Sequence, residues 1–223
     1  MKNIYSISHF NFFDKIIFKK RTEILSIIKS MIDLKMVSSC LDIGTTNDFD
    51  KKSSNLIIKN LREITILKSI SNQKIDESFF NISLTKSITN DFTNIEIDKM
   101  SSDLVISSAT IEHVGNEKNQ IKMIENIIKL SKKYFVITTP NKLYPIDFHT
   151  KIPLIHWLPK KVHRFLLKII GLNYLSKEEN LNLLSKSDLE KMMKNFNDLV
   201  DFKIQTINLF NFVSNFVVIG KIK

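Results

Sequence analysis

The sequence Ser39-Cys40-Leu41-Asp42-Ile43-Gly44 has the pattern of a short buried strand that ends at a glycine. The runs Leu104–Ser107 and Tyr134–Thr138 have the same short apolar pattern further along the chain. Between these two runs, Glu117–Leu130 carries apolar residues at helical spacing. A helix that joins two buried strands is typical of an α/β protein with a parallel sheet.

Further segments extend this alternation. Apolar runs at 64–67 and 82–84 are short enough to be strands, and residues 12–32 mix apolar and basic positions at helical spacing. The β-rich runs 201–209 and 212–222 are separated by a short connection, which indicates an antiparallel hairpin. We therefore predict an α/β fold: a Rossmann-like, doubly wound, mostly parallel sheet of about seven strands, with a C-terminal antiparallel hairpin and helices on both faces.

Length and composition favour one domain over residues 1–223. The hydrophobic fraction of 43% and the charged fraction of 25% are ordinary for a globular protein, and the length allows one sizeable core. A single cysteine, Cys40, excludes an internal disulfide. The first residues show no signal-peptide pattern, and no apolar run approaches the ~18–20 residues of a spanning helix. We expect a cytoplasmic location.

The formal net charge of +10 indicates affinity for anionic partners, because basic surfaces attract phosphate groups. The lysines are spread along the chain and are rarely interleaved with aromatic residues, so a solvated lysine-rich surface is the favoured interpretation. Contact with an anionic membrane stays open, and nucleic acid is the less favoured partner.

The residues that follow each strand are the candidate binding residues, because ligands of open α/β sheets bind beyond the carboxyl ends of the strands. Gly44 permits a tight turn and a close backbone approach, and Asp42 supplies an acceptor for a ligand amine. This turn lacks the further glycines of a dinucleotide-binding fingerprint and the Gly-Lys-Ser/Thr of a phosphate-binding loop.

Three features resemble class I S-adenosylmethionine-dependent methyltransferases. Asp91 lies twelve residues before Asp103, which begins the strand at 104–107. Residues 104–114 resemble that family's fourth strand and the Glu-His-Val turn after it, and residues 137–141 resemble the end of its fifth strand. Residues 138–150 and 155–159 are also similar to a bacterial subgroup linked to surface-polysaccharide or lipid metabolism.

The resemblance implies S-adenosylmethionine as the cofactor and methyl transfer by in-line displacement as the reaction. It implies that Asp91 holds the adenine amino group. The cofactor-binding residues implied by position are Asp42, Gly44, Thr45, Thr46, Asn72, Asp91, Phe92, Ser107 and Ser108.

The sequence departs from the family at two places. The glycine-rich first loop is reduced to Gly44, with Thr45 and Thr46 in place of further glycines. The family has an acidic residue at the end of its second strand that binds the ribose hydroxyls, whereas residues 64–72 contain no carboxylate. Asn72 or Ser69 is the substitute, with weaker hydrogen bonds than an ionised acceptor would accept.

Methyl transfer needs alignment of the acceptor more than a catalytic group, and a general base is required only for some acceptors. His113 follows the fourth strand and is the first candidate base, with a packing role beside Glu112 or Glu117 as the alternative. His149 would line the acceptor pocket and Asn141 would orient the acceptor. His149, His156 and His163 stand at seven-residue steps on a proline-broken segment, so we predict no metal site.

Residues 143–171 form a predicted insertion on the acceptor side, and it acts as a lid in this interpretation. Within it, 160–170 reads as a helix that ends at Gly171, with one apolar face and one basic face. The favoured interpretation packs the face with Val162 and Phe165 on the domain. The alternative places the helix on an anionic membrane, on the inner face of the cell membrane.

The acceptor is predicted to be a small molecule, a glycan or a lipid-linked compound. Two alternatives stay open at this point. One is an RNA or protein methyltransferase, which the charge alone suggests. The other is a degenerate methyltransferase-like fold that acts as a membrane-associated or scaffold protein, which the missing ribose-binding carboxylate suggests. A capping-box pattern of Ser187 and Glu190 predicts a last helix at 188–196.

Overall fold

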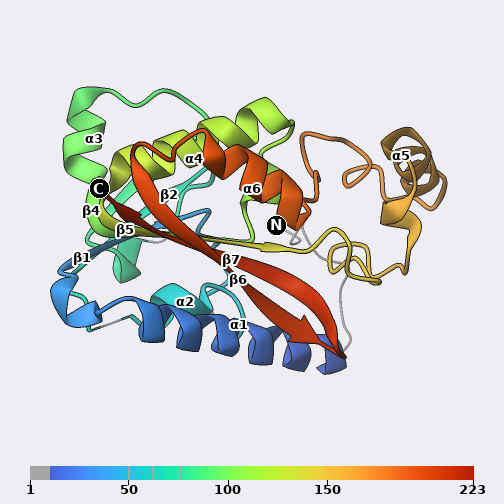
Figure 1. Cartoon of the computed structure of the whole chain (residues 1–223), viewed down its shortest axis with the longest axis horizontal. Coiled ribbons are helices and arrows are strands. Elements are labelled where there is room, and N and C mark those ends of the chain that lie inside the picture. Colours follow the sequence, from blue (N-terminus) through green and yellow to red (C-terminus); the bar gives the residue numbers. More distant parts are fainter. Residues whose placement is uncertain (1–10, 50, 62, 76) are drawn as a thin grey trace.

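Seven strands form one mixed sheet in the computed structural model, which describes residues 11–49, 51–61, 63–75 and 77–223 (Figure 1). Their order across the sheet is β3-β2-β1-β4-β5-β7-β6. The strands are β1 (Ser39–Ile43), β2 (Ile66–Ser71), β3 (Ile82–Thr85), β4 (Ser102–Ser108), β5 (Ser131–Pro140), β6 (Val200–Leu209) and β7 (Phe212–Ile222).

The chain order reverses between β1 and β4. β1 pairs in parallel with β2 on one side and with β4 on the other, and β3 and β5 extend the parallel set. β7 runs antiparallel to both β5 and β6. The predicted doubly wound, mostly parallel sheet with a C-terminal antiparallel hairpin is confirmed.

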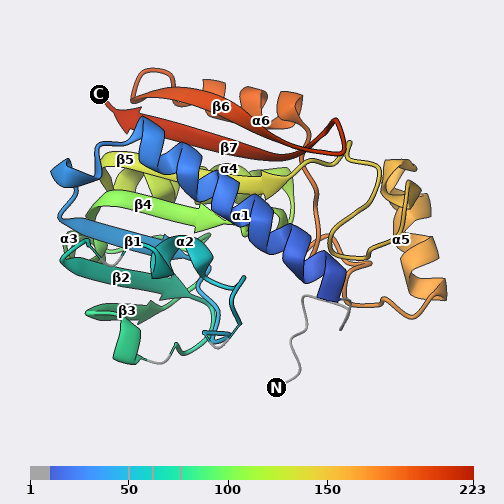
Figure 2. The same ribbon diagram turned by 90° about the horizontal axis from the view of Figure 1, so that it is seen from below.

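Helices cover both faces of this sheet, as predicted (Figures 1 and 2). α1 (Asn11–Met31) and α2 (Leu56–Lys59) lie on one face. The other face carries α3 (Asn94–Met100), α4 (Glu117–Leu130) and α6 (Lys186–Lys194).

Two hydrophobic cores lie on opposite faces of the sheet, because successive side chains of a strand point to opposite faces. Leu41 and Ile43 of β1 pack in the core that holds the apolar residues of α4 and α6. Cys40, the residue before Leu41, points to the opposite face and packs in the core that holds α1 and α2. The central strands are thus buried on both faces, which fits their continuous apolar pattern.

Three local predictions are corrected by the structure. The second strand is β2 at Ile66–Ser71 and not 64–67. The polar residues of β2 interrupt the apolar pattern from which a buried strand is recognised. One of them, Lys68, extends its Nζ to Lys99 O at 2.7 Å and to Ser101 O at 2.8 Å. The capping box of α6 is made by Ser185 and Asp188, not by Ser187 and Glu190. α2 and α3 are short and were not predicted.

The predicted helix at 160–170 is present as α5 (Lys160–Ile169), and Gly171 ends it with φ of 83°. Its predicted packing is wrong, because Val162 and Phe165 are exposed. The buried residue is Leu167, which packs on Leu175 and Leu181 of the following segment. Figure 1 shows α5 far from the helices that cover the sheet.

Among the described residues, no helix combines the length and the hydropathy that crossing a membrane requires.

Gly220 of β7 is a packing constraint between β7 and β5. It stands opposite Phe135 in the antiparallel register, and a Cβ at this position would lie 2.1 Å from Phe135 Cε1 and Cζ. Phe135 is fully buried, so its ring has little room to move. We predict that Gly220→Ala lowers the free energy of unfolding by ~1–3 kcal/mol, measured by urea denaturation.

The added substitution Phe135→Leu should recover part of this loss, because it removes the ring atoms nearest the new Cβ. Wild-type stability of Gly220→Ala would contradict the prediction.

Candidate active site

The carboxyl ends of β1 and β4 lie side by side at the reversal in strand order, which is where ligands of such sheets bind (Figure 2). Gly44 follows β1 with φ of 87°, a left-handed conformation that favours glycine. A Cβ at Gly44 would lie 2.2 Å from Thr110 Oγ1, in the loop after β4. Glycine at this position therefore lets the loops after β1 and β4 approach each other.

Asp42 is a buried carboxylate at this edge. Its Oδ2 accepts a hydrogen bond from Thr45 Oγ1 at 2.6 Å, and Thr45 O accepts one from Ser71 Oγ at 2.8 Å. Burial raises the pKa of Asp42 to about 6, against the opposing effects of the Thr45 hydrogen bond and the Arg21 charge. Arg21 belongs to α1, so this helix brings a cation to the edge of the sheet.

The other predicted cofactor residues at the edge are held by polar contacts. Thr46 N–H donates to Asn55 Oδ1 at 3.2 Å, and Ser107 Oγ donates to Ile43 O at 3.3 Å. Ser108 Oγ accepts from Thr138 Oγ1 at 3.2 Å. The structure thus brings the following residues to the carboxyl ends of β1, β2 and β4: Asp42, Gly44, Thr45, Thr46, Asn72, Ser107 and Ser108.

Asp91 and Phe92, two further predicted cofactor residues, both contact other side chains of the protein. Asp91 is exposed, and its carboxylate pairs with Lys122 Nζ of α4 at 2.9 Å. The hydrogen bond from Lys122 lowers the pKa of Asp91. Phe92 is buried in the core that holds α4, with Lys86 Nζ 4.9 Å from its ring centroid. Phe92 shares this core with Ile43, the residue before Gly44, and the cofactor role of both residues stays a prediction.

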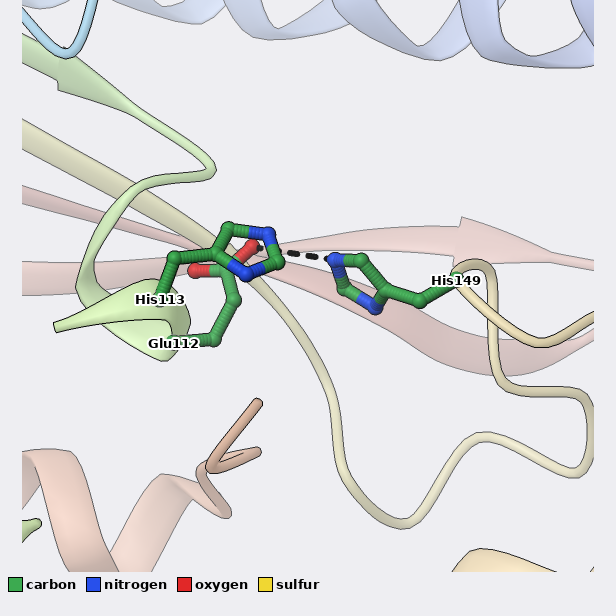
Figure 3. A group of neighbouring side chains, drawn as sticks. All are labelled: Glu112, His113 and His149. Atoms are coloured by element: carbon green, nitrogen blue, oxygen red, sulfur yellow. Dashed lines mark ion pairs between the residues drawn. The ribbon is translucent and has the colours of Figure 1, made fainter. Parts of the chain in front are cut away.

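Glu112, in the loop after β4, is completely buried beside His113 and His149 (Figure 3). Its Oε2 accepts a hydrogen bond from Thr139 Oγ1 at 2.9 Å. Its Oε1 lies 3.7 Å from His149 Nε2 and accepts no hydrogen bond from the described residues. Burial raises the pKa of Glu112, and the positive charge of His149 opposes that effect.

Asp147 holds His149 in place. Asp147 Oδ1 accepts hydrogen bonds from His149 Nδ1 at 3.1 Å and from the His149 backbone N–H at 3.0 Å. Its Oδ2 accepts from Thr150 Oγ1 at 2.8 Å. Although burial alone lowers the pKa of His149, the bond to Asp147 and its charge raise it. The same contacts outweigh burial and hold the pKa of Asp147 below its usual range.

His113 lies against His149, with ring centroids 4.7 Å apart in a T-shaped arrangement. His113 Nδ1 donates to Asn180 O at 2.6 Å. Burial, helped by the charge of His149, lowers the pKa of His113 to about 3, so its imidazole is neutral and a weak base.

Asn141 is held by backbone groups. Its Nδ2 donates to Val213 O at 2.8 Å and its Oδ1 accepts from Leu143 N–H at 2.9 Å, which anchors the segment after β5. Of the predicted catalytic residues, the structure brings His113 and His149 together and gives Asn141 this anchoring position.

Sequence reasoning missed Arg21, Glu112 and Asp147 as site residues. Asp147 had a visible signal, because an Asp followed two and three residues later by His149 and Thr150 is the spacing of a side-chain-capped turn. Arg21 had none, since its position depends on how α1 crosses the sheet.

The histidines at seven-residue steps do not form one group. In the part of the chain that the structure describes, the group of three potential metal ligands is Glu112, His113 and His149, whose ligand atoms lie within 4.8 Å of one another. His156 instead donates from Nε2 to Tyr144 O at 2.8 Å. Of the three histidines at seven-residue steps, only His149 belongs to the group of potential ligands.

No protein-family model matches the chain, and no curated protein matches it. Solved structures do. Magnesium protoporphyrin IX methyltransferase (ChlM) from Synechocystis PCC 6803 with bound S-adenosylmethionine has a TM-score of 0.55 at 10% identity, covering 100% of this chain and 89% of that chain. N-methyltransferase NodS from Bradyrhizobium japonicum WM9 with S-adenosylhomocysteine has a TM-score of 0.52 at 10% identity, covering 92% and 86%.

The chain has the methyltransferase fold. A further solved structure, from Rhodobacter sphaeroides and provisionally described as a zinc-dependent alcohol dehydrogenase, has a TM-score of 0.57 at 10% identity and covers 91% of this chain and 90% of that chain. Identities this low establish the fold alone, and the chemistry has to be argued from the site itself.

The raised pKa of Asp42 predicts a pH-dependent loss of stability. Because the folded pKa of about 6 exceeds the usual value near ~3.9, the native state keeps a proton that the unfolded state releases between these values. Ionisation of Asp42 therefore removes stability as the pH rises through this window, by about 3 kcal/mol when complete.

Asp42→Asn should lack this contribution. Relative to wild type, its free energy of unfolding should rise between pH 4 and pH 7, as measured by chemical denaturation across that range. A difference that stays constant with pH would contradict the assignment.

Proposed function

We propose that the chain is a class I S-adenosylmethionine-dependent methyltransferase that acts on a small-molecule, glycan or lipid-linked acceptor. The observation that carries this proposal is the methyltransferase fold with Gly44 and the buried Asp42 at the reversal in strand order. The solved structures of ChlM and NodS hold S-adenosylmethionine and S-adenosylhomocysteine respectively, which supports the same cofactor here.

The cofactor supplies an electrophilic methyl group, and the protein aligns the acceptor with it. The left-handed turn at Gly44 fits a close approach of a ligand to the backbone. Ionised Asp42 would accept a hydrogen bond from the cofactor ammonium, and Thr46 and Ser108 lie at the same edge. Asn72, just after β2, would bond the ribose hydroxyls more weakly than a carboxylate does.

Arg21 gives the proposed site a positive charge. Its guanidinium is buried, which lowers its pKa, while the charges of Glu112 and Asp42 act to raise it. A cation in this position would attract the carboxylate of the cofactor, and it would compensate Asp42 once that residue ionises. Asp91 remains the proposed partner of the adenine amino group, because its ion pair with Lys122 is exposed and weak.

The acceptor side is proposed to be the segment 143–171, which acts as a lid in a single domain over 1–223. A small cavity of about 40 Å³ in this region is lined in part by cationic side chains, two of which, Lys160 and Arg164, pair with Glu178. It favours an acceptor that carries an anionic group, such as the phosphate of a lipid-linked compound. The cationic and histidine side chains of the lining are Lys142, His156, Lys160, His163 and Arg164.

Where the acceptor requires loss of a proton, His149 is the proposed base. Asp147 fixes its ring through Nδ1, so that Nε2 is the nitrogen that faces the loop after β4. His113 is less suited, since its pKa is lowered to about 3.

Calorimetric titration with S-adenosylmethionine and S-adenosylhomocysteine tests the proposal. We expect both to bind wild type, with an affinity that rises as the pH passes about 6 because Asp42 ionises there. Asp42→Asn should weaken binding about tenfold or more and abolish the pH dependence, because it removes one charged hydrogen bond.

Glu125→Ala is the matched control, since it removes a surface carboxylate that pairs with Lys122. It should bind both compounds as wild type does. Absence of binding by the folded wild type would reject the enzyme in favour of a degenerate fold.

We also propose that α5 rests on an anionic membrane surface. Val162, Phe165 and Ile169 are exposed by 44%, 63% and 65%, and Trp157 beside the helix is exposed by 49%. Lys161 and Lys168 are exposed on the same short helix. An apolar face flanked by lysines fits the interface of an anionic bilayer, and it would bring the acceptor side of the sheet to lipid-linked compounds.

Sedimentation with vesicles tests this contact. We expect binding to vesicles that contain phosphatidylglycerol, weaker binding to phosphatidylcholine alone, and loss of binding in Phe165→Ser/Ile169→Ser. Phe210→Ser/Phe212→Ser is the control, because these exposed side chains lie at the β6–β7 turn. Equal binding by both double variants, or none by wild type, would contradict membrane contact through α5.

A further inference from the structure

Glu112, His113 and His149 converge from two separate parts of the chain. Glu112 and His113 are consecutive in the loop after β4, and His149 comes from the segment after β5. Figure 3 shows the two imidazole rings and the carboxylate pointing toward one another. One ligand atom of each lies within 4.8 Å of the others.

Both imidazoles are oriented by an oxygen acceptor at Nδ1. His149 Nδ1 bonds Asp147 Oδ1 at 3.1 Å, and His113 Nδ1 bonds Asn180 O at 2.6 Å. Each Nδ1 therefore carries the proton in the neutral ring, and Nε2 carries the lone pair. Metal-binding histidines have this arrangement, in which a carboxylate or a backbone carbonyl fixes the ring from behind.

The carboxylate has an unsatisfied oxygen on the same side. Glu112 is fully buried, its Oε2 is bonded to Thr139, and its Oε1 accepts no hydrogen bond from the described residues. A buried carboxylate oxygen without a hydrogen bond is costly, and a cation bound at Oε1 would compensate it at closer range than His149 does at 3.7 Å.

We propose that Glu112, His113 and His149 bind a divalent transition-metal ion. Two imidazole nitrogens and one carboxylate oxygen form the ligand set of open zinc and iron sites, whereas magnesium and calcium prefer oxygen ligands alone. Zinc binds these ligand types at ~2.0–2.2 Å, so the three side chains close slightly around the ion. Three protein ligands leave a coordination position for water or another oxygen.

The ion would stand beside the loop where the ends of β1 and β4 meet, because Glu112 and His113 follow β4 directly. Its open position would bind an acceptor hydroxyl and favour loss of the hydroxyl proton. This role rests on the proposed methyl transfer, whereas the metal site itself does not. His149 Nε2 can either coordinate the metal or act as the general base, because it has one lone pair. A measurement of metal binding distinguishes these two roles.

The test uses untagged full-length protein dialysed against a chelator. Titration with Co²⁺ is followed by visible absorption, and titration with Zn²⁺ by calorimetry. We expect one ion per chain, and a ~10–100-fold or larger loss of affinity in Glu112→Gln and in His149→Gln. His156→Gln is the control, because His156 is also buried and bonded to a backbone carbonyl but is not part of the group.

Circular dichroism and thermal unfolding establish that the variants are folded, and Zn²⁺ should raise the unfolding temperature of wild type and His156→Gln only. Absence of stoichiometric binding by wild type, or equal binding by folded Glu112→Gln and His149→Gln, would overturn the proposal. Titration of wild type with S-adenosylhomocysteine keeps the two hypotheses apart: cofactor binding by wild type without metal binding rejects the metal site alone.

Discussion

Burying an ionisable carboxylate costs several kcal/mol unless charges and hydrogen bonds compensate it, and Glu112 is fully buried where four parts of the chain meet. Thr139 of β5 donates to its Oε2, and His149 approaches its Oε1. Its backbone carbonyl accepts from Asn182 N–H at 2.7 Å, and the charge of Arg21 on α1 acts on it. Glu112 thus connects four parts of the chain: the loop after β4, β5 with the segment that follows it, the segment before α6, and α1. Any ligand that binds at the end of the sheet meets this arrangement of charges already in place.

The sheet could be predicted from the sequence because its central strands are buried on both faces. Ser39–Ile43, Ser102–Ser108 and the later part of β5 read as short apolar runs, and their alternation with α4 predicts parallel pairing. β2 was displaced in the prediction because a strand containing Lys68 and Ser69 does not look buried. Its lysine donates hydrogen bonds to two backbone carbonyls at the C-terminal end of α3, which no local pattern reveals.

The site could be predicted only where a local pattern marks its residues. Asp42 and Gly44 were found because a polar residue and a glycine at the end of a strand are informative by position alone. Arg21 and Asp147 act through contacts between distant segments. α5 shows the same limit: its pattern identifies an apolar face, but the segment packs Leu167 on Leu175 and Leu181 and leaves Phe165 exposed. Which face of a helix is buried depends on its partners as well as on its own sequence.

We propose that the reversal in strand order between β1 and β4 is a cofactor site that ends at the buried Glu112. The decisive measurement is a crystal structure of the protein in complex with S-adenosylhomocysteine. We expect electron density for the ligand over Gly44, with its amino-acid end near Asp42 and Arg21 and its ribose near Asn72. Density at another place in the fold would show that this reversal is not the cofactor site.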